Sequence, residues 1–203
     1  WNEIEPNSAG VSFNITNVPP YQHSVLGGFM IMSAPKQGVV LSSGINTSIE
    51  SVPETIRSEW LCGGATVWKQ EIVQKFMLKE INTRWAACED VLFSYPIGKK
   101  YPLYVCADAK VRHEHVLDHK ASMKYRFYGK TQTLWRLYFV ELNKDLSRLS
   151  YFWNLFTMII ARFSIGLLTL NKKHMQFGIG QIEGGFIGLL TIMGYRNLLL
   201  YLE

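Results

Sequence analysis

The most restrictive feature of this sequence is a run of 22 residues, 149–170, in which Arg162 is the single charged side chain. A helix of this length could cross a bilayer. Its polar residues interrupt the run and fall roughly on one helical face: Ser150, Asn154, Thr157 and Ser164. This pattern favours an amphipathic helix at a membrane surface over a free span, and a core helix covered by a partner domain is the remaining alternative.

A second apolar stretch, 177–202, follows and is rich in glycine. Its glycines would allow close packing of this stretch on the first one. Basic residues flank the first stretch and could bind anionic lipid: Lys144, Arg148, Lys172 and Lys173. We therefore expect a helical tail over residues 123–203 that contacts a membrane surface.

Composition excludes a disordered chain, because 48% of the 203 residues are hydrophobic and only 18% are charged. The net charge of +5 is concentrated in residues 61–150, which contain 15 basic and nine acidic side chains. Such an excess suits a phosphate-bearing substrate or a lipid headgroup, although a solvated basic face would give the same count. The sequence shows no zinc-finger spacing, RNP motif or arginine-rich helix, so we expect no nucleic-acid partner.

Three cysteines, Cys62, Cys88 and Cys106, are an odd number without CxxC spacing. A disulfide framework is therefore not expected, and a reducing compartment such as the cytoplasm is favoured. The chain starts at Trp1 rather than at a methionine, and we expect it to be the back part of a longer protein.

The first 122 residues predict an α/β layer. Residues 1–58 suggest loops around a few strands, one of them the apolar run 29–32. Thr66 is a plausible N-cap for a following helix, and residues 88–95 predict a short helix that Pro96 should stop or kink. Two short strands, 101–106 and 109–113, are expected to meet at Asp108.

Three short motifs follow one another in this first part. They are Gly63-Gly64 after Trp60, Glu89-Asp90, and His113. Each alone has an ordinary structural explanation, because paired glycines form turns and acids at a helix start interact with the helix dipole. Their order and spacing together indicate a site.

The stretches WLCGGATVWKQEIVQKF and ACEDVLFSYPIGKKYPLYVCADAKVRHEH resemble the glycosyltransferase family 2 enzymes, in particular the back half of their nucleotide-sugar-binding GT-A domain. The tail is similar to the membrane-proximal helices of bacterial surface-polysaccharide and rhamnosyltransferase-like members. The resemblance implies a Rossmann-like GT-A fold over residues 1–122, with the nucleotide-binding part missing. It also implies inverting transfer of a sugar from a nucleotide-sugar donor to a glycan or lipid-linked acceptor, at the cytoplasmic face of the inner membrane. This sequence contains no Asp-x-Asp motif, so we expect weak donor binding by the fragment alone.

The same resemblance implies a role for each motif residue. Asp90 would be the catalytic base and Glu89 would orient the acceptor. Gly63, Gly64 and Trp60 would bind the acceptor. His113, with His115 as a competitor, would bind a divalent metal, Mg²⁺ or Mn²⁺, at the donor diphosphate. The sequence departs from the family pattern at Leu92, where an acid is common, and at Pro96, where a base is common.

Two other functions remain open from the sequence. A non-enzymatic membrane-associated interaction protein would explain the apolar tail with its flanking bases. A carbohydrate-binding module would use Trp60, Trp68 and Trp85 as stacking surfaces, although tryptophans with apolar neighbours are more often core residues.

Overall fold

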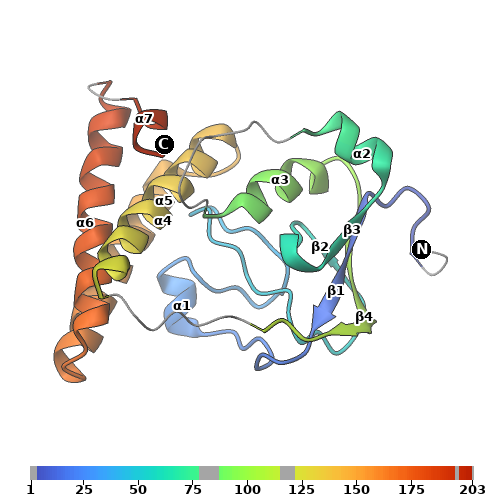
Figure 1. Ribbon diagram of the computed structural model, residues 1–203, viewed down its shortest axis with the longest axis horizontal. Helices are drawn as coiled ribbons and strands as arrows, with labels where there is room; N and C mark the ends of the chain where they lie inside the picture. The colour runs from blue at the N-terminus through green and yellow to red at the C-terminus, as the bar shows by residue number, and fades with distance from the viewer. Residues whose placement is uncertain (1–3, 78–86, 115–121, 195–196, 203) are drawn as a thin grey trace. The chain divides into compact units, whose positions relative to one another are not determined.

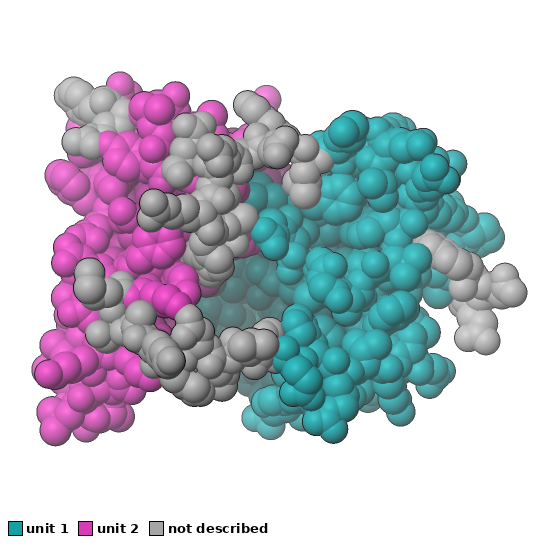
Figure 2. Space-filling model, viewed as in Figure 1, with its two compact units in different colours: residues 1–41, 45–79, 89–115 teal, residues 42–44, 80–88, 116–203 magenta. Residues whose placement is uncertain are grey.

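The computed structural model describes residues 4–77, 87–114, 122–194 and 197–202. The chain divides into two compact units (Figure 2). Unit 1 comprises residues 1–41, 45–79 and 89–115, and unit 2 comprises residues 42–44, 80–88 and 116–203. Two residues considered in the sequence, Trp85 and His115, lie outside the described residues.

Unit 1 contains a four-stranded mixed sheet of order β2-β4-β1-β3 (Figure 1). The two central strands, β1 and β4, are parallel, and the outer strands pair antiparallel to them. Alternate residues of β4 are buried, with Leu103 and Val105 at 0% exposure, as expected for a strand with one face on the core. The strands are β1 (Gly10–Ile15), β2 (Ile56–Ser58), β3 (Thr66–Trp68) and β4 (Leu103–Val111).

Short helices and one 3-10 turn complete the described part of unit 1. They are α1 (Val25–Phe29), η1 (Gly63–Ala65), α2 (Gln70–Lys75) and α3 (Glu89–Gly98). Helix α3 begins with two acids in its first turn, where the helix dipole favours negative charge. The unit is therefore mixed α/β, in agreement with the expected fold class at that level.

Several local expectations for unit 1 were wrong. Residues 29–32 do not form a buried strand, because α1 ends at Phe29 and the Phe29 side chain is 63% exposed. Thr66 begins strand β3, and α2 starts after Lys69 instead. Pro96 was expected to stop or kink the helix, and it does not stop it: it lies inside α3, two residues before its end, where a proline removes one intrahelical hydrogen bond.

The two strands expected to meet at Asp108 are one strand, β4. The expected break is present as a change of register: Phe13 pairs with Cys106, whereas the next residue, Asn14, pairs with Lys110. The Asn14 side chain donates to the Ala107 carbonyl at 3.2 Å and so compensates for the interrupted ladder.

Unit 2 consists mainly of three helices of 21 residues each. Helix α4 (Ser122–Leu142) is at the core of the unit: Leu134, Leu137 and Phe139 have 0% exposure. The helices are α4 (Ser122–Leu142), α5 (Arg148–Leu168), α6 (Lys172–Ile192) and the short α7 (Leu199–Leu202).

The glycines of α6 bring its backbone against α4, and also against α5 as the sequence predicted (Figure 1). A Cβ atom at Gly180 would lie 2.0 Å from the Arg126 carbonyl oxygen of α4, a backbone atom. A Cβ at Gly185 would instead meet the end of the Leu155 side chain of α5, at 2.8 Å. Close backbone packing therefore occurs mainly between α4 and α6.

We predict that Gly180→Ala lowers the free energy of unfolding of unit 2 by about 1–3 kcal/mol, because the backbones must separate. Gly185→Ala is the matched control: the Leu155 side chain can rotate away, and the change should stay within about 1 kcal/mol of wild type. Thermal and denaturant unfolding followed by circular dichroism measure both. Equal destabilisation by the two variants would contradict the backbone contact.

Candidate functional site

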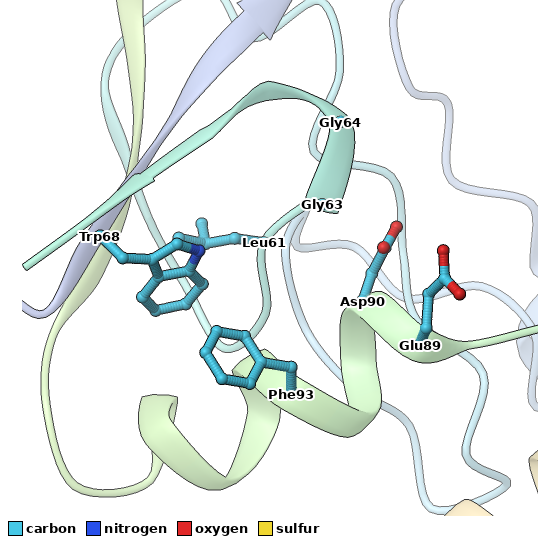
Figure 3. A pocket seen from close by; sticks show the side chains of 7 residues that line it. All are labelled: Leu61, Gly63, Gly64, Trp68, Glu89, Asp90 and Phe93. Carbon is cyan, nitrogen blue, oxygen red and sulfur yellow. The ribbon is translucent and has the colours of Figure 1, made fainter. Parts of the chain in front are cut away.

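An open pocket of about 510 Å³ lies in unit 1 between the Gly63-Gly64 turn and the start of α3 (Figure 3). The Ser12 hydroxyl of β1 holds one end of the turn by donating to the Ala65 carbonyl at 3.0 Å. At the other end, the Thr66 hydroxyl donates a hydrogen bond to the Cys62 carbonyl. The pocket is lined by Leu61, Gly63, Gly64, Trp68, Glu89, Asp90 and Phe93.

The Asp90 carboxylate points from the first turn of α3 toward the glycine turn (Figure 3). Its Oδ1 would lie 2.6 Å from a Cβ atom at Gly63, so no side chain fits at that position without moving the carboxylate. Burial raises the pKa of the Asp90 carboxyl above its ordinary value, while hydrogen bonds from the Gly63 N–H and the Cys62 thiol oppose the rise. A carboxylate with a raised pKa is a better proton acceptor at neutral pH.

Glu89 lies beside Asp90 and also lines the pocket, but its side chain is more exposed. Both carboxylates project from the start of α3 on the side of the turn (Figure 3). The two acids of the Glu-Asp motif therefore differ in exposure to solvent.

Ser94 connects the turn to α3, and the sequence analysis missed it. The Leu61 N–H donates to the Ser94 hydroxyl at 3.0 Å, and that hydroxyl donates to the Asp90 carbonyl at 2.5 Å. Ser94 is fully buried. Its position four residues after Asp90, on the same helical face, was the available signal.

Trp68 and Phe93 form the apolar wall of the pocket (Figure 3). Their rings are 5.0 Å apart between centroids and meet edge to face. Phe93 was also missed in the sequence, whereas Trp68 had been considered a stacking surface.

The structure does not bring Trp60 into the pocket. Its side chain is 8% exposed, and the indole N–H donates to the Thr47 carbonyl at 3.0 Å. Trp60 is a core residue here, and we leave it out of the proposed acceptor site.

His113 follows β4 and approaches the turn at Gly64, with its Cε1 atom 3.4 Å from a Cβ position there. Asn17 holds the His113 backbone at two points: the amide nitrogen donates to the His113 carbonyl at 2.9 Å, and the His113 N–H donates to the amide oxygen at 3.0 Å. The two-glycine turn thus contacts Asp90 through Gly63 and His113 through Gly64. The structure brings together these three predicted motifs.

A divalent metal does not fit the described residues as a complete site. Within the part of the chain that the structure describes, no three His, Cys, Asp or Glu side chains are grouped to hold an ion. Arg112, next to His113 in the sequence, forms an exposed ion pair with Glu114 at 3.3 Å. His113 is therefore at most one ligand of a metal.

We predict that Asp90→Asn stabilises the fold at pH 7. The folded-state pKa of Asp90 is raised, so the folded protein takes up its proton at higher pH than the unfolded chain and loses stability as pH rises from about 4. The difference in Tm between Asp90→Asn and wild type should therefore increase from pH 4 to pH 8. The control is Glu89→Gln, the exposed neighbour. A variant less stable than wild type at pH 7 would contradict the burial of this charge.

Comparisons with protein-family models, with curated proteins and with solved structures found no match for this chain.

Proposed function

We propose that this chain is the acceptor-side part of an inverting glycosyltransferase, a transferase that moves a sugar from a nucleotide-sugar donor to a glycan or lipid-linked acceptor in cell-surface polysaccharide synthesis. The main support is the position of Asp90: a half-buried carboxylate with raised pKa, held against an exposed glycine turn at an open pocket. The resemblance to glycosyltransferase family 2 assigns the base to the same residue. In this proposal unit 1 is the back half of a GT-A domain.

The proposed chemistry is a single displacement. Asp90 takes the proton of an acceptor hydroxyl as the oxygen attacks the anomeric carbon of the donor sugar. The new glycosidic C–O bond forms while the C–O bond to the nucleoside diphosphate breaks, and the diphosphate leaves with the electron pair. Attack from the face opposite the leaving group inverts the anomeric configuration.

The pocket has the features that binding a sugar acceptor needs. Gly63 and Gly64 are exposed and have no side chains, so a sugar can approach their backbone closely. The Trp68 and Phe93 wall offers an apolar surface to the C–H face of a sugar ring. Glu89 would hold a second acceptor hydroxyl.

The donor diphosphate would lie on the His113 side of the glycine turn. We include Mg²⁺ or Mn²⁺ as the cofactor of the proposed enzyme, with His113 as a single ligand. Because the described residues do not form a complete metal site, no step above depends on the ion.

We predict that Asp90→Asn, in the natural protein that contains this sequence, reduces sugar transfer by about 10²–10⁴-fold, because the general base is lost. Transfer is measured as acceptor-dependent release of nucleoside diphosphate from a panel of UDP-, GDP- and dTDP-sugars. Near-wild-type transfer by the folded variant would eliminate the assigned base.

Two glycine variants provide the matched control. Gly63→Ala should also impair transfer, since its Cβ would lie 2.6 Å from the Asp90 Oδ1 atom. Gly64→Ala adds a Cβ at an ordinary contact distance of 3.4 Å from His113 and should retain more activity. The reverse order would contradict the proposed position of the carboxylate.

We also propose that unit 2 contacts an anionic membrane surface, which would make the protein peripheral at the cytoplasmic face of the inner membrane. Among the described residues, one helix, α5, is long and apolar enough to cross a bilayer, with mean hydropathy 1.4; core helices of soluble proteins can meet this criterion too. Two residues of its polar face are inward, Asn154 at 1% and Thr157 at 9% exposure, whereas Ser164 is exposed. Its apolar face is outward along the whole helix, at Leu149, Trp153, Phe156, Ile160 and Leu167. A polar face inside and an apolar face outside is the arrangement that lipid favours.

We predict that the double variant Phe156→Asp, Ile160→Asp abolishes flotation of the protein with vesicles containing anionic phosphatidylserine. Leu26→Asp, at a 68% exposed leucine of α1 in unit 1, is the control and should float like wild type. No flotation of the wild-type protein would remove the membrane proposal. A non-enzymatic membrane protein, the alternative function, would float in the same way and be indifferent to Asp90→Asn.

A further inference from the structure

The pocket between the glycine turn and α3 has two chemically different ends. The rings of Trp68 and Phe93 lie at one end, and the carboxylates of Glu89 and Asp90 lie at the other (Figure 3). Within the described part of the chain, none of the lining residues is a lysine, an arginine or a histidine. The described lining therefore combines an apolar surface with two negative charges and no positive charge.

The aromatic end is fixed by the sheet and by α3. Trp68 is the last residue of β3 and pairs with Gly10 of β1, where a Cβ atom would lie 2.5 Å from Cε3 of the indole. The indole therefore rests directly on the β1 backbone, and Phe93 contacts it edge to face from α3. A ring surface fixed in this way can stack on the C–H face of a sugar with little loss of conformational entropy.

The acidic end determines which charge a ligand can carry. Glu89 is exposed and Asp90 is half-buried, and both carboxylates can accept hydrogen bonds from sugar hydroxyls. Lys69, the base next to Trp68 in the sequence, does not line the pocket and donates to the Pro6 carbonyl at 2.5 Å. An anionic group in the pocket would approach two carboxylates, and repulsion between like charges at close range lowers affinity.

We propose that this pocket selects an uncharged sugar residue as the acceptor and rejects sugars that carry a carboxylate or a phosphate. Trp68 and Phe93 bind the C–H face of the ring, and Glu89 and Asp90 accept hydrogen bonds from its hydroxyls. This inference rests on the proposed function, in which the pocket binds the acceptor. The same two charges keep the diphosphate of the donor out of the pocket, so donor and acceptor do not compete for it.

The first test compares sugars that differ in charge and needs no donor. The probes are the methyl glycosides of glucose, galactose and mannose and those of the corresponding uronic acids, in which a carboxylate replaces the C6 hydroxymethyl group. Binding to the full chain is followed by the indole N–H resonance of Trp68 in ¹H–¹⁵N NMR spectra, which is assigned by its loss in Trp68→Phe. In each pair that binds, the neutral sugar should have a Kd about three- to tenfold lower than the uronic acid.

Trp60 serves as an internal control for this titration. Its indole N–H donates to the Thr47 carbonyl in the core, so its resonance should not shift with any probe. The same resonance reports whether each variant has kept its fold. Equal affinities within the pairs, or no shift of the Trp68 resonance with any of the probes, would overturn the proposal.

The second test asks whether the two carboxylates cause the preference. Glu89→Gln and Asp90→Asn each remove one charge and keep a polar side chain of the same size, so each should lower the Kd of the uronic acids by about two- to fivefold and change that of the neutral sugars less. Glu54→Gln is the matched control, because Glu54 is exposed in unit 1 and does not line the pocket. In the wild-type protein, about 1 M salt should weaken the preference. A preference that is unchanged in both carboxylate variants would contradict the proposal.

These measurements separate the inference from the proposed function. If transfer requires Asp90 but the uronic acids bind as tightly as their neutral partners, the selectivity fails alone. If the neutral sugars bind preferentially but Asp90→Asn transfers sugar normally, the proposed function fails. The acceptor role then fails with it, and the selectivity stands as the property of a pocket that only binds neutral carbohydrate.

Discussion

The geometry of the candidate site depends on one buried hydroxyl. Ser94 accepts from the Leu61 N–H and donates to the Asp90 carbonyl, so it fixes the distance between the segment leading into the glycine turn and the first turn of α3. A buried polar group with both roles satisfied is difficult to move, because any displacement leaves a donor or acceptor unpaired. The contact of Asp90 with Gly63 follows from this constraint. The residue that carries the proposed chemistry is exposed to the pocket, whereas the residue that places it is at 0% exposure.

Unit 2 depends on a different constraint: the backbones of α4 and α6 approach each other closely. A side chain at Gly129, Gly180 or Gly184 would collide with the facing backbone, so α4 and α6 meet without intervening side chains. This contact uses the glycine face of α6 and leaves its larger apolar residues, among them Phe186 at 63% exposure, on the outside. Helix α5 likewise exposes its apolar face. Small residues inside and large apolar residues outside is the pattern of helices that associate in lipid, where packing replaces the hydrophobic effect between helices.

The sequence predicted the long helices and the motif residues better than the short elements. Residues 149–170 were predicted as a helix because length and apolar content determine that outcome almost alone, and α5 covers Arg148–Leu168. The short apolar run at 29–32 was wrongly predicted as a strand, since a run of this size fits a strand or a turn of helix equally and the contacts of Ser24 and Ser33 decide it. For the site, the sequence identified Asp90, Glu89, the glycines and His113. It could not distinguish Trp60 from Trp68, because which of the two is covered depends on the distant Thr47 carbonyl.

The surroundings of Asp90 are consistent with a compromise between ionisation and reactivity. Burial raises the pKa of the Asp90 carboxyl and so disfavours the ionised form that a base needs. The Gly63 N–H and the Cys62 thiol work against burial, but both are neutral donors, so they support the charged form without neutralising it as a lysine or arginine would. A cationic partner would lower the pKa further and make the carboxylate a weaker base. The glycine at position 63 therefore serves this compromise directly: it admits the carboxylate, because a Cβ atom there would lie 2.6 Å from the Asp90 Oδ1 atom.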